Sequence, residues 1–167
     1  MELANQFSYL LFGLGTLVAL TAVLRWRRVA WRPVLLIGLL VVTVFTAGFL
    51  ALRPGVSDVT DAAEAQALIG DGKPTLLEFY SNYCAGCMAV RPQVDALIAE
   101  LGDTFNVLRI DIHTPVGREL RRVYGFTYSP EFVLFDADGR ETWRSNSPPP
   151  AAELARISAG EITNTIQ

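Results

Sequence analysis

Residues 75–87 have the sequence TLLEFYSNYCAGC, and their pattern organises the interpretation of the whole chain. The first six are mostly apolar with a single acid, which is typical of a buried strand. A helix is predicted from about Cys84 to Leu101, with a kink at Pro92. The chain's two cysteines therefore lie directly after a strand and at the start of a helix. A C-x-x-C pair in this position indicates redox activity.

The two cysteines have different expected roles. The start of a helix offers free backbone N–H groups and the positive end of the helix dipole, which favour a thiolate at Cys84 and lower its pKa. Cys87 lies one helical turn further on, close enough to attack a mixed disulfide. We therefore expect Cys84 to be the nucleophile and Cys87 to resolve the mixed disulfide. A purely structural disulfide is the alternative, although a loop this short adds little stability.

The sequence offers no ligand set with the spacing of a metal site. A structural zinc site takes about four ligands, whereas residues 53–167 offer Cys84, Cys87 and one distant histidine, His113. Haem attachment needs a histidine directly after the second cysteine, and Met88 stands there. We therefore expect neither a metal nor a cofactor, and we expect His113 to be an ordinary surface histidine.

The other predicted elements alternate between helices and strands. A short helix is predicted from Thr60 or Asp61 to Ile69. Beyond the C-x-x-C helix, the sequence predicts three strands and two further helices, which are strands 105–111, 131–135 and 140–144 and helices 115–124 and 148–157. This order indicates an α/β domain with a hairpin at one edge.

Residues 58–160 resemble the thioredoxin superfamily. The match rests on the strand and C-x-x-C at 77–87, on Pro92, and on the YGFTYSP segment, strand and Asp-Gly turn that begin at Tyr124. The resemblance implies a mixed central sheet flanked by helices. It also implies exchange of disulfides with client proteins through the cysteine pair, without a cofactor.

The resemblance assigns further residues around the pair. Pro130 falls at the family's cis-proline, which faces the cysteines, so the Ser129–Pro130 bond is expected to be cis. The backbone of Ser129 is then expected to pair with a client chain. Tyr83, Ala85 and Gly86 are expected to form the rim that a client contacts.

Three positions depart from the family's usual pattern. Tyr83 stands where most members have Trp, and Glu131 is charged where small polar residues are common. The dipeptide Ala85-Gly86 differs from the Gly-Pro of reducing members and from the His-containing dipeptide of oxidising ones. The direction of electron flow therefore stays open.

The family's first strand is expected to be short, near Val56, or absent.

Glu78 is the single acid in the predicted central strand. Strand alternation puts it on the same face as Leu76 and Tyr80, and a central strand is covered on both faces. We therefore expect Glu78 to be buried, with a raised pKa. The resemblance places a buried acid beneath the second cysteine, so Glu78 is expected to accept the proton that Cys87 loses. A partly exposed or salt-bridged Glu is the alternative.

Two apolar segments precede the domain. Residues 3–24 and 33–52 carry no charge, and each is near the roughly 20 residues that cross a bilayer as a helix. Four arginines lie between them in residues 25–32, which marks this loop as cytoplasmic by the positive-inside rule. Both termini and the domain over 60–167 are then expected outside the cytoplasm, with 53–59 as a linker. A signal peptide is the alternative, but its basic start and short apolar core are missing.

Charge separates the two parts of the chain. Residues 1–52 hold four Arg and one Glu, a net +3, while residues 53–167 hold ten basic and sixteen acidic residues, a net −6. An acidic domain argues against nucleic acid as a partner, because binding it takes a basic face.

The expected function is that of an extracytoplasmic thiol–disulfide oxidoreductase, held at the cell membrane by two spans. Resemblance to the tethered thioredoxin-like proteins of cytochrome c biogenesis favours reduction of client disulfides, with electrons from a membrane partner. Two alternatives stay open. One is a disulfide-forming oxidase. The other is a non-catalytic subunit of a membrane complex, which the presence of two spans rather than one suggests.

Overall fold

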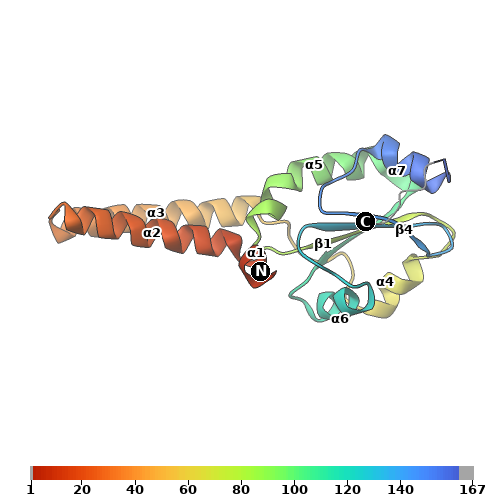
Figure 1. Ribbon diagram of the computed structural model, residues 1–167, viewed down its shortest axis with the longest axis horizontal. Coiled ribbons are helices and arrows are strands. Elements are labelled where there is room, and N and C mark those ends of the chain that lie inside the picture. Colours follow the sequence, from red (N-terminus) through yellow and green to blue (C-terminus); the bar gives the residue numbers. More distant parts are fainter. Residues whose placement is uncertain (1, 162–167) are drawn as a thin grey trace.

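The computed structural model describes residues 2–161. An α/β domain forms one end of the molecule, and two long helices project from it side by side (Figure 1). The predicted fold class, an α/β domain with a mixed sheet flanked by helices, is confirmed.

The domain is built on a four-stranded sheet with the order β2-β1-β3-β4. The central strand β1 (Thr75–Tyr80) is parallel to β2 (Asn106–Asp111) and antiparallel to β3 (Glu131–Phe135). β4 (Glu141–Ser145) forms the predicted edge hairpin with β3.

Two helices cover each face of the sheet (Figure 1). On one face lie α5 (Ala85–Leu101), which continues into the 3-10 turn η1 (Gly102–Thr104), and α7 (Ala151–Ser158). On the other lie α4 (Ala62–Leu68) and α6 (Pro115–Val123). α7 starts later than the sequence predicts, because Pro150 has an extended rather than a helical backbone.

The side chains of β1 alternate between the two faces, and all six residues are buried. Leu77 and Phe79 pack in the core beneath α4 and α6, whereas Leu76 packs in the core beneath α5 and α7. Burial of an apolar side chain of this size contributes about 1.5–3 kcal/mol. The alternation places Glu78 and Tyr80 on the face of the sheet that α5 covers. The cysteine pair lies at the start of this helix.

The family's first strand is absent from the described residues. Instead, the segment before α4 meets the edge of β2 at Ser57, whose hydroxyl accepts from the Asp111 N–H at 2.9 Å, and at Asp58. The Asp58 N–H donates to the Arg109 carbonyl at 3.0 Å, and the Asp58 carboxylate accepts from the Arg109 N–H at 2.7 Å. The Asp58 carboxylate thus accepts the hydrogen bond that a backbone carbonyl would accept if this segment were a paired strand. Val59 still reaches the core, whereas Val56 is exposed.

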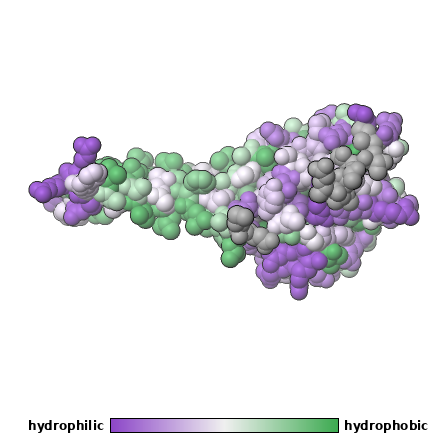
Figure 2. Space-filling model, in the orientation of Figure 1, coloured by the Kyte–Doolittle hydropathy of each residue, from purple (hydrophilic) through white to green (hydrophobic). Residues whose placement is uncertain are grey.

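Three helices precede the domain, namely α1 (Glu2–Gln6), α2 (Ser8–Trp26) and α3 (Trp31–Leu52). α2 and α3 are long and apolar enough to cross a bilayer, and none of their residues is buried. Figure 2 shows apolar surface along this hairpin and hydrophilic surface at its tip and over the domain. The sequence predicts one helix over 3–24, whereas the structure breaks it at Phe7, and α1 lies against the domain.

Candidate active site

The cysteine pair lies at the start of α5. Cys84 is the N-cap residue, and its sulfur accepts a hydrogen bond from the Cys87 N–H at 3.2 Å. Both side chains are free thiols and are fully buried together with Tyr80. The sulfur satisfies one of the N–H groups that every helix start leaves without a partner. The same bond favours a negative charge on Cys84.

The two thiols differ in acidity. The pKa of Cys84 falls to about 6, mainly because the Cys87 thiol can donate a hydrogen bond to the Cys84 thiolate. Burial opposes this shift, and the backbone N–H groups of Cys87 and Gly86 add to it. The pKa of Cys87 rises, because burial disfavours its charged form and the Cys84 thiolate stands beside it. A charged first thiol next to a neutral second one suits a nucleophile and a resolving residue.

Ser129 and Pro130 lie against the pair. The Ser129–Pro130 bond is cis, as predicted. The Cys84 thiol donates to the Ser129 carbonyl at 3.5 Å, across 45 residues of sequence. A Cβ added to Gly86 would lie 3.7 Å from both the Cys84 sulfur and the Pro130 ring. The fold therefore brings these four residues together.

Glu78 is buried as predicted, with 2% of its surface exposed, and it is also salt-bridged. Its Oε2 lies 2.9 Å from Nε of Arg109, and Arg109 also reaches Asp95 of α5 at 3.3 Å. The pKa of Glu78 is raised, because burial outweighs the charge and hydrogen bond of Arg109. Tyr80, two residues along the same face, packs with both cysteines. A buried carboxyl group of raised pKa therefore lies on the α5 face of β1.

Glu131 lies on the opposite face from Glu78. It is fully buried, forms an ion pair with Arg144 at 3.1 Å and accepts from the Thr127 hydroxyl at 2.6 Å. Its neighbour across the sheet is Phe79, which belongs to the core beneath α4 and α6. The Glu131 carboxylate, which is unusual at this position, therefore stabilises the turn before the cis-proline.

The expectation of an ordinary surface histidine at His113 is wrong. His113 is half-buried, with Nε2 3.0 Å from the Ser81 hydroxyl and its ring centroid 5.7 Å from that of Tyr83. Burial lowers its pKa. The sequence does contain a signal that His113 lies near the active site. Ser81 and His113 follow neighbouring parallel strands, whose carboxyl ends meet at one sheet edge. Within residues 2–161, no three His, Cys, Asp or Glu side chains form a group that could hold a metal ion.

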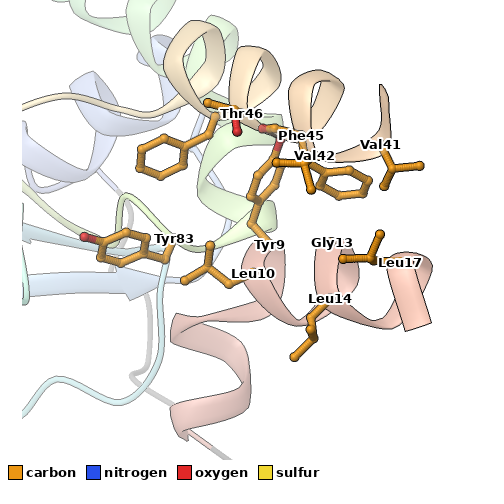
Figure 3. A pocket seen from close by; sticks show the side chains of 11 residues that line it. Tyr9, Leu10, Gly13, Leu14, Leu17, Val41, Val42, Phe45, Thr46 and Tyr83 are labelled. Atoms are coloured by element: carbon orange, nitrogen blue, oxygen red, sulfur yellow. Dashed lines mark hydrogen bonds between the residues drawn. The ribbon is translucent and has the colours of Figure 1, made fainter. Parts of the chain in front are cut away.

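A cavity of about 390 Å³ lies between α2 and α3 and reaches the active-site loop (Figure 3). Its lining is apolar and aromatic, with Tyr9 and Phe45 from the hairpin and Tyr83 at the domain end. Tyr83 is fixed by both long helices, because its ring stacks on Phe49 at 5.7 Å and its carbonyl accepts from the Tyr9 N–H at 3.0 Å. The residue before Cys84 thus joins the hairpin to the domain.

Comparison with known proteins identifies the domain. The family model for thioredoxin matches residues 56–158. The chain belongs to the thioredoxin family. Thioredoxin from Mycolicibacterium smegmatis is 30% identical over 77 residues, which cover 46% of this chain and 69% of that protein. Thioredoxin from Porphyra purpurea is 32% identical over 85 residues, which cover 51% and 78%.

A solved structure agrees with the fold. Oxidised mitochondrial thioredoxin 3 of Saccharomyces cerevisiae superposes with a TM-score of 0.51 at 20% identity, covering 67% of this chain and 98% of that one. The thioredoxin domain makes the chain a thiol–disulfide oxidoreductase that acts on protein disulfides. The hairpin and α1 lie outside the matched region.

Proposed function

We propose that the chain is a membrane-tethered oxidoreductase whose thioredoxin domain lies outside the cytoplasm and reduces the disulfides of client proteins. The observation that carries the proposal is the buried pair at the start of α5, in which Cys84 is acidic and Cys87 is not. This difference gives each thiol one of the two steps of disulfide reduction.

In the first step the Cys84 thiolate attacks one sulfur of a client disulfide. A bond forms between Cys84 and that sulfur, and the other client sulfur leaves as a thiolate and takes up a proton. Cys84 needs no base for this step, because a thiol with a pKa of about 6 is mostly ionised at neutral pH. Pro130, together with the backbone of Ser129, would hold the client chain beside the sulfur, with Tyr83, Ala85 and Gly86 at the rim.

In the second step Cys87 attacks the Cys84 sulfur of the mixed disulfide. The second client thiol is released, and Cys84 and Cys87 become a disulfide. Cys87 must first lose its proton, and burial makes that loss costly. Glu78 is the proposed acceptor, directly or through water, because it is buried on the same face and its own pKa is raised toward that of a general base.

Electrons must then return to the Cys84–Cys87 disulfide. A membrane partner that carries reducing equivalents across the bilayer would supply them. Tethering is supported by two unburied apolar helices, and the orientation by the arginine-rich loop at the tip of the hairpin.

Oxidation of clients is the second candidate function. A low pKa at the attacking cysteine stabilises the reduced form and makes the disulfide a stronger oxidant. The pKa of about 6 at Cys84 is consistent with such a shift. A non-catalytic subunit is the third, supported by the apolar cavity between the helices.

The reduction potential of the purified full chain separates these functions. Equilibration with glutathione buffers should give a value near that of thioredoxin, about −270 mV, whereas a value near about −120 mV would assign oxidation. Cys84→Ser is the control and should show no exchange with a disulfide-bonded test protein. Lack of exchange by a wild type whose reduced Cys84 is alkylated by iodoacetamide would assign the non-catalytic role, because the thiol is then accessible.

A further inference from the structure

The chain's own N-terminal segment lies against the residues that surround the cysteine pair. We define the N-terminal lid as residues 2–9, which comprise α1, Phe7 and the first residues of α2. The Oδ1 atom of Asn5 accepts two hydrogen bonds from Ser129, one from the backbone N–H and one from the hydroxyl, each at 3.1 Å. The Ser8 hydroxyl accepts from the Ala85 N–H at 3.0 Å.

Two further residues of the lid, Gln6 and Phe7, contact the rim of the site. The Gln6 carbonyl accepts from the Ser81 hydroxyl at 2.9 Å. The Phe7 ring lies 5.6 Å from Tyr83, stacked, and 5.0 Å from His113. The lid therefore contacts the residues that follow β1 and β2, the cis-proline segment and the first turn of α5.

These are the groups that a client needs. The backbone N–H of Ser129 is the donor expected to pair with a client chain, and Asn5 occupies it. The Ala85 N–H stands at the open end of α5, next to the attacking sulfur, and Ser8 occupies it. Cys84 has 0% exposed surface, so no client sulfur can reach it in this arrangement.

We propose that the N-terminal lid takes the place of a bound client chain and must leave the cysteine pair before Cys84 can react. The proposal concerns regulation of the site and rests on the proposed function for what the open site does. Phe7 is non-helical (φ −116°, ψ 19°) between two helices, so the chain can bend at this residue and carry Asn5 and Gln6 away from the site. A few hydrogen bonds and one aromatic stack hold it, which makes opening a reversible, local event.

Alkylation of the reduced full chain in detergent or a lipid disc tests the lid. If closing is faster than alkylation, the rate is proportional to the open fraction. Asn5→Ala removes the acceptor for two donors, and one hydrogen bond corresponds to a factor of about five, so iodoacetamide should react at least about fivefold faster. Phe7→Ala should accelerate the reaction similarly. Leu3→Ala is the matched control, because Leu3 is 72% exposed and its loss should leave the rate unchanged.

Two checks keep the result interpretable. The rates are compared at about pH 8, where the Cys84 thiol is ionised in every variant, so a difference reports access rather than acidity. Ser8→Ala gives a second opening variant if Asn5→Ala unfolds, as judged by the melting temperature. Equal rates for wild type, Asn5→Ala and Phe7→Ala would overturn the lid. Alkylation needs only the thiol, so this outcome is independent of whether the protein reduces, oxidises or only binds its clients.

Discussion

Replacing Cys87 by Ala should make Cys84 less acidic. The Cys87 thiol is the largest cause of the lowered pKa of Cys84, ahead of the backbone N–H groups. Cys87→Ala removes the thiol and keeps the N–H of residue 87, which lies 3.2 Å from the Cys84 sulfur. The substitution therefore separates the contribution of the side chain from that of the helix start.

The size of the effect follows from the energy of one hydrogen bond. A hydrogen bond to a charged group contributes about 1.5–3 kcal/mol, and one pKa unit corresponds to about 1.4 kcal/mol. Because a thiol is a weak donor, the lower end applies, and the pKa of Cys84 should rise by about one unit, to about 7. At about pH 7 the thiolate fraction should then fall from about nine-tenths to about a half.

Ultraviolet absorbance of the thiolate, followed over a pH titration of the reduced protein, measures this pKa. It needs no reagent to reach the buried sulfur, so the N-terminal lid does not affect it. Cys87→Ser is the matched control, because its hydroxyl can donate where the thiol did and should keep the pKa near its wild-type value. A Cys87→Ala protein that titrates like the wild type would refute the assigned cause and leave the start of α5 as the source of the acidity.

Three further predictions test the roles and the topology. Cys87→Ser should accumulate mixed disulfides with clients on a non-reducing gel and Cys84→Ser should not; the reverse pattern would exchange their roles. Glu78→Gln should slow release of a mixed disulfide by about a hundredfold above the raised pKa of Glu78 and spare the first attack, and rate–pH profiles identical to the wild type would remove Glu78 from the mechanism. In a chain with both cysteines changed to Ser, Asp138→Cys should react with a membrane-impermeant reagent on intact cells, and labelling only after lysis would place the domain in the cytoplasm.

The parts of the fold that the sequence predicts are those governed by local pattern. Apolar content gives β1, and the cysteine spacing at a helix start gives the active-site pair. The cap of α4 is another such case, since Asp61 accepts from the Ala63 N–H as helix-start chemistry requires. These signals lie within a few residues of what they determine, so one sequence is enough to detect them.

The partners of the buried charges could not be predicted in this way. Arg109 faces Glu78 only because β1 and β2 pair in one particular register, and a shift by one residue would put Arg109 on the other face. Arg144 reaches Glu131 across the β3–β4 hairpin for the same reason. The lid could not be predicted because an uncharged stretch such as 3–24 fits a single helix, and neither the break at Phe7 nor the contact of Asn5 with Ser129 has a local sequence signal.

The contacts of Tyr83 and Arg91 give a structural reason for two long helices where one would suffice as an anchor. Tyr83 bonds to the backbone of α2 and stacks on α3, so both helices bear on the residue before Cys84. Arg91 of α5 donates to the carbonyls of Ala51 and Arg53, at the end of α3 where carbonyls lack helical partners. α5 is thereby fixed to the hairpin just before its start, through Tyr83, and along its length, through Arg91. The hairpin thus contacts the residues on both sides of the cysteine pair in the sequence, Tyr83 before it and Arg91 after it.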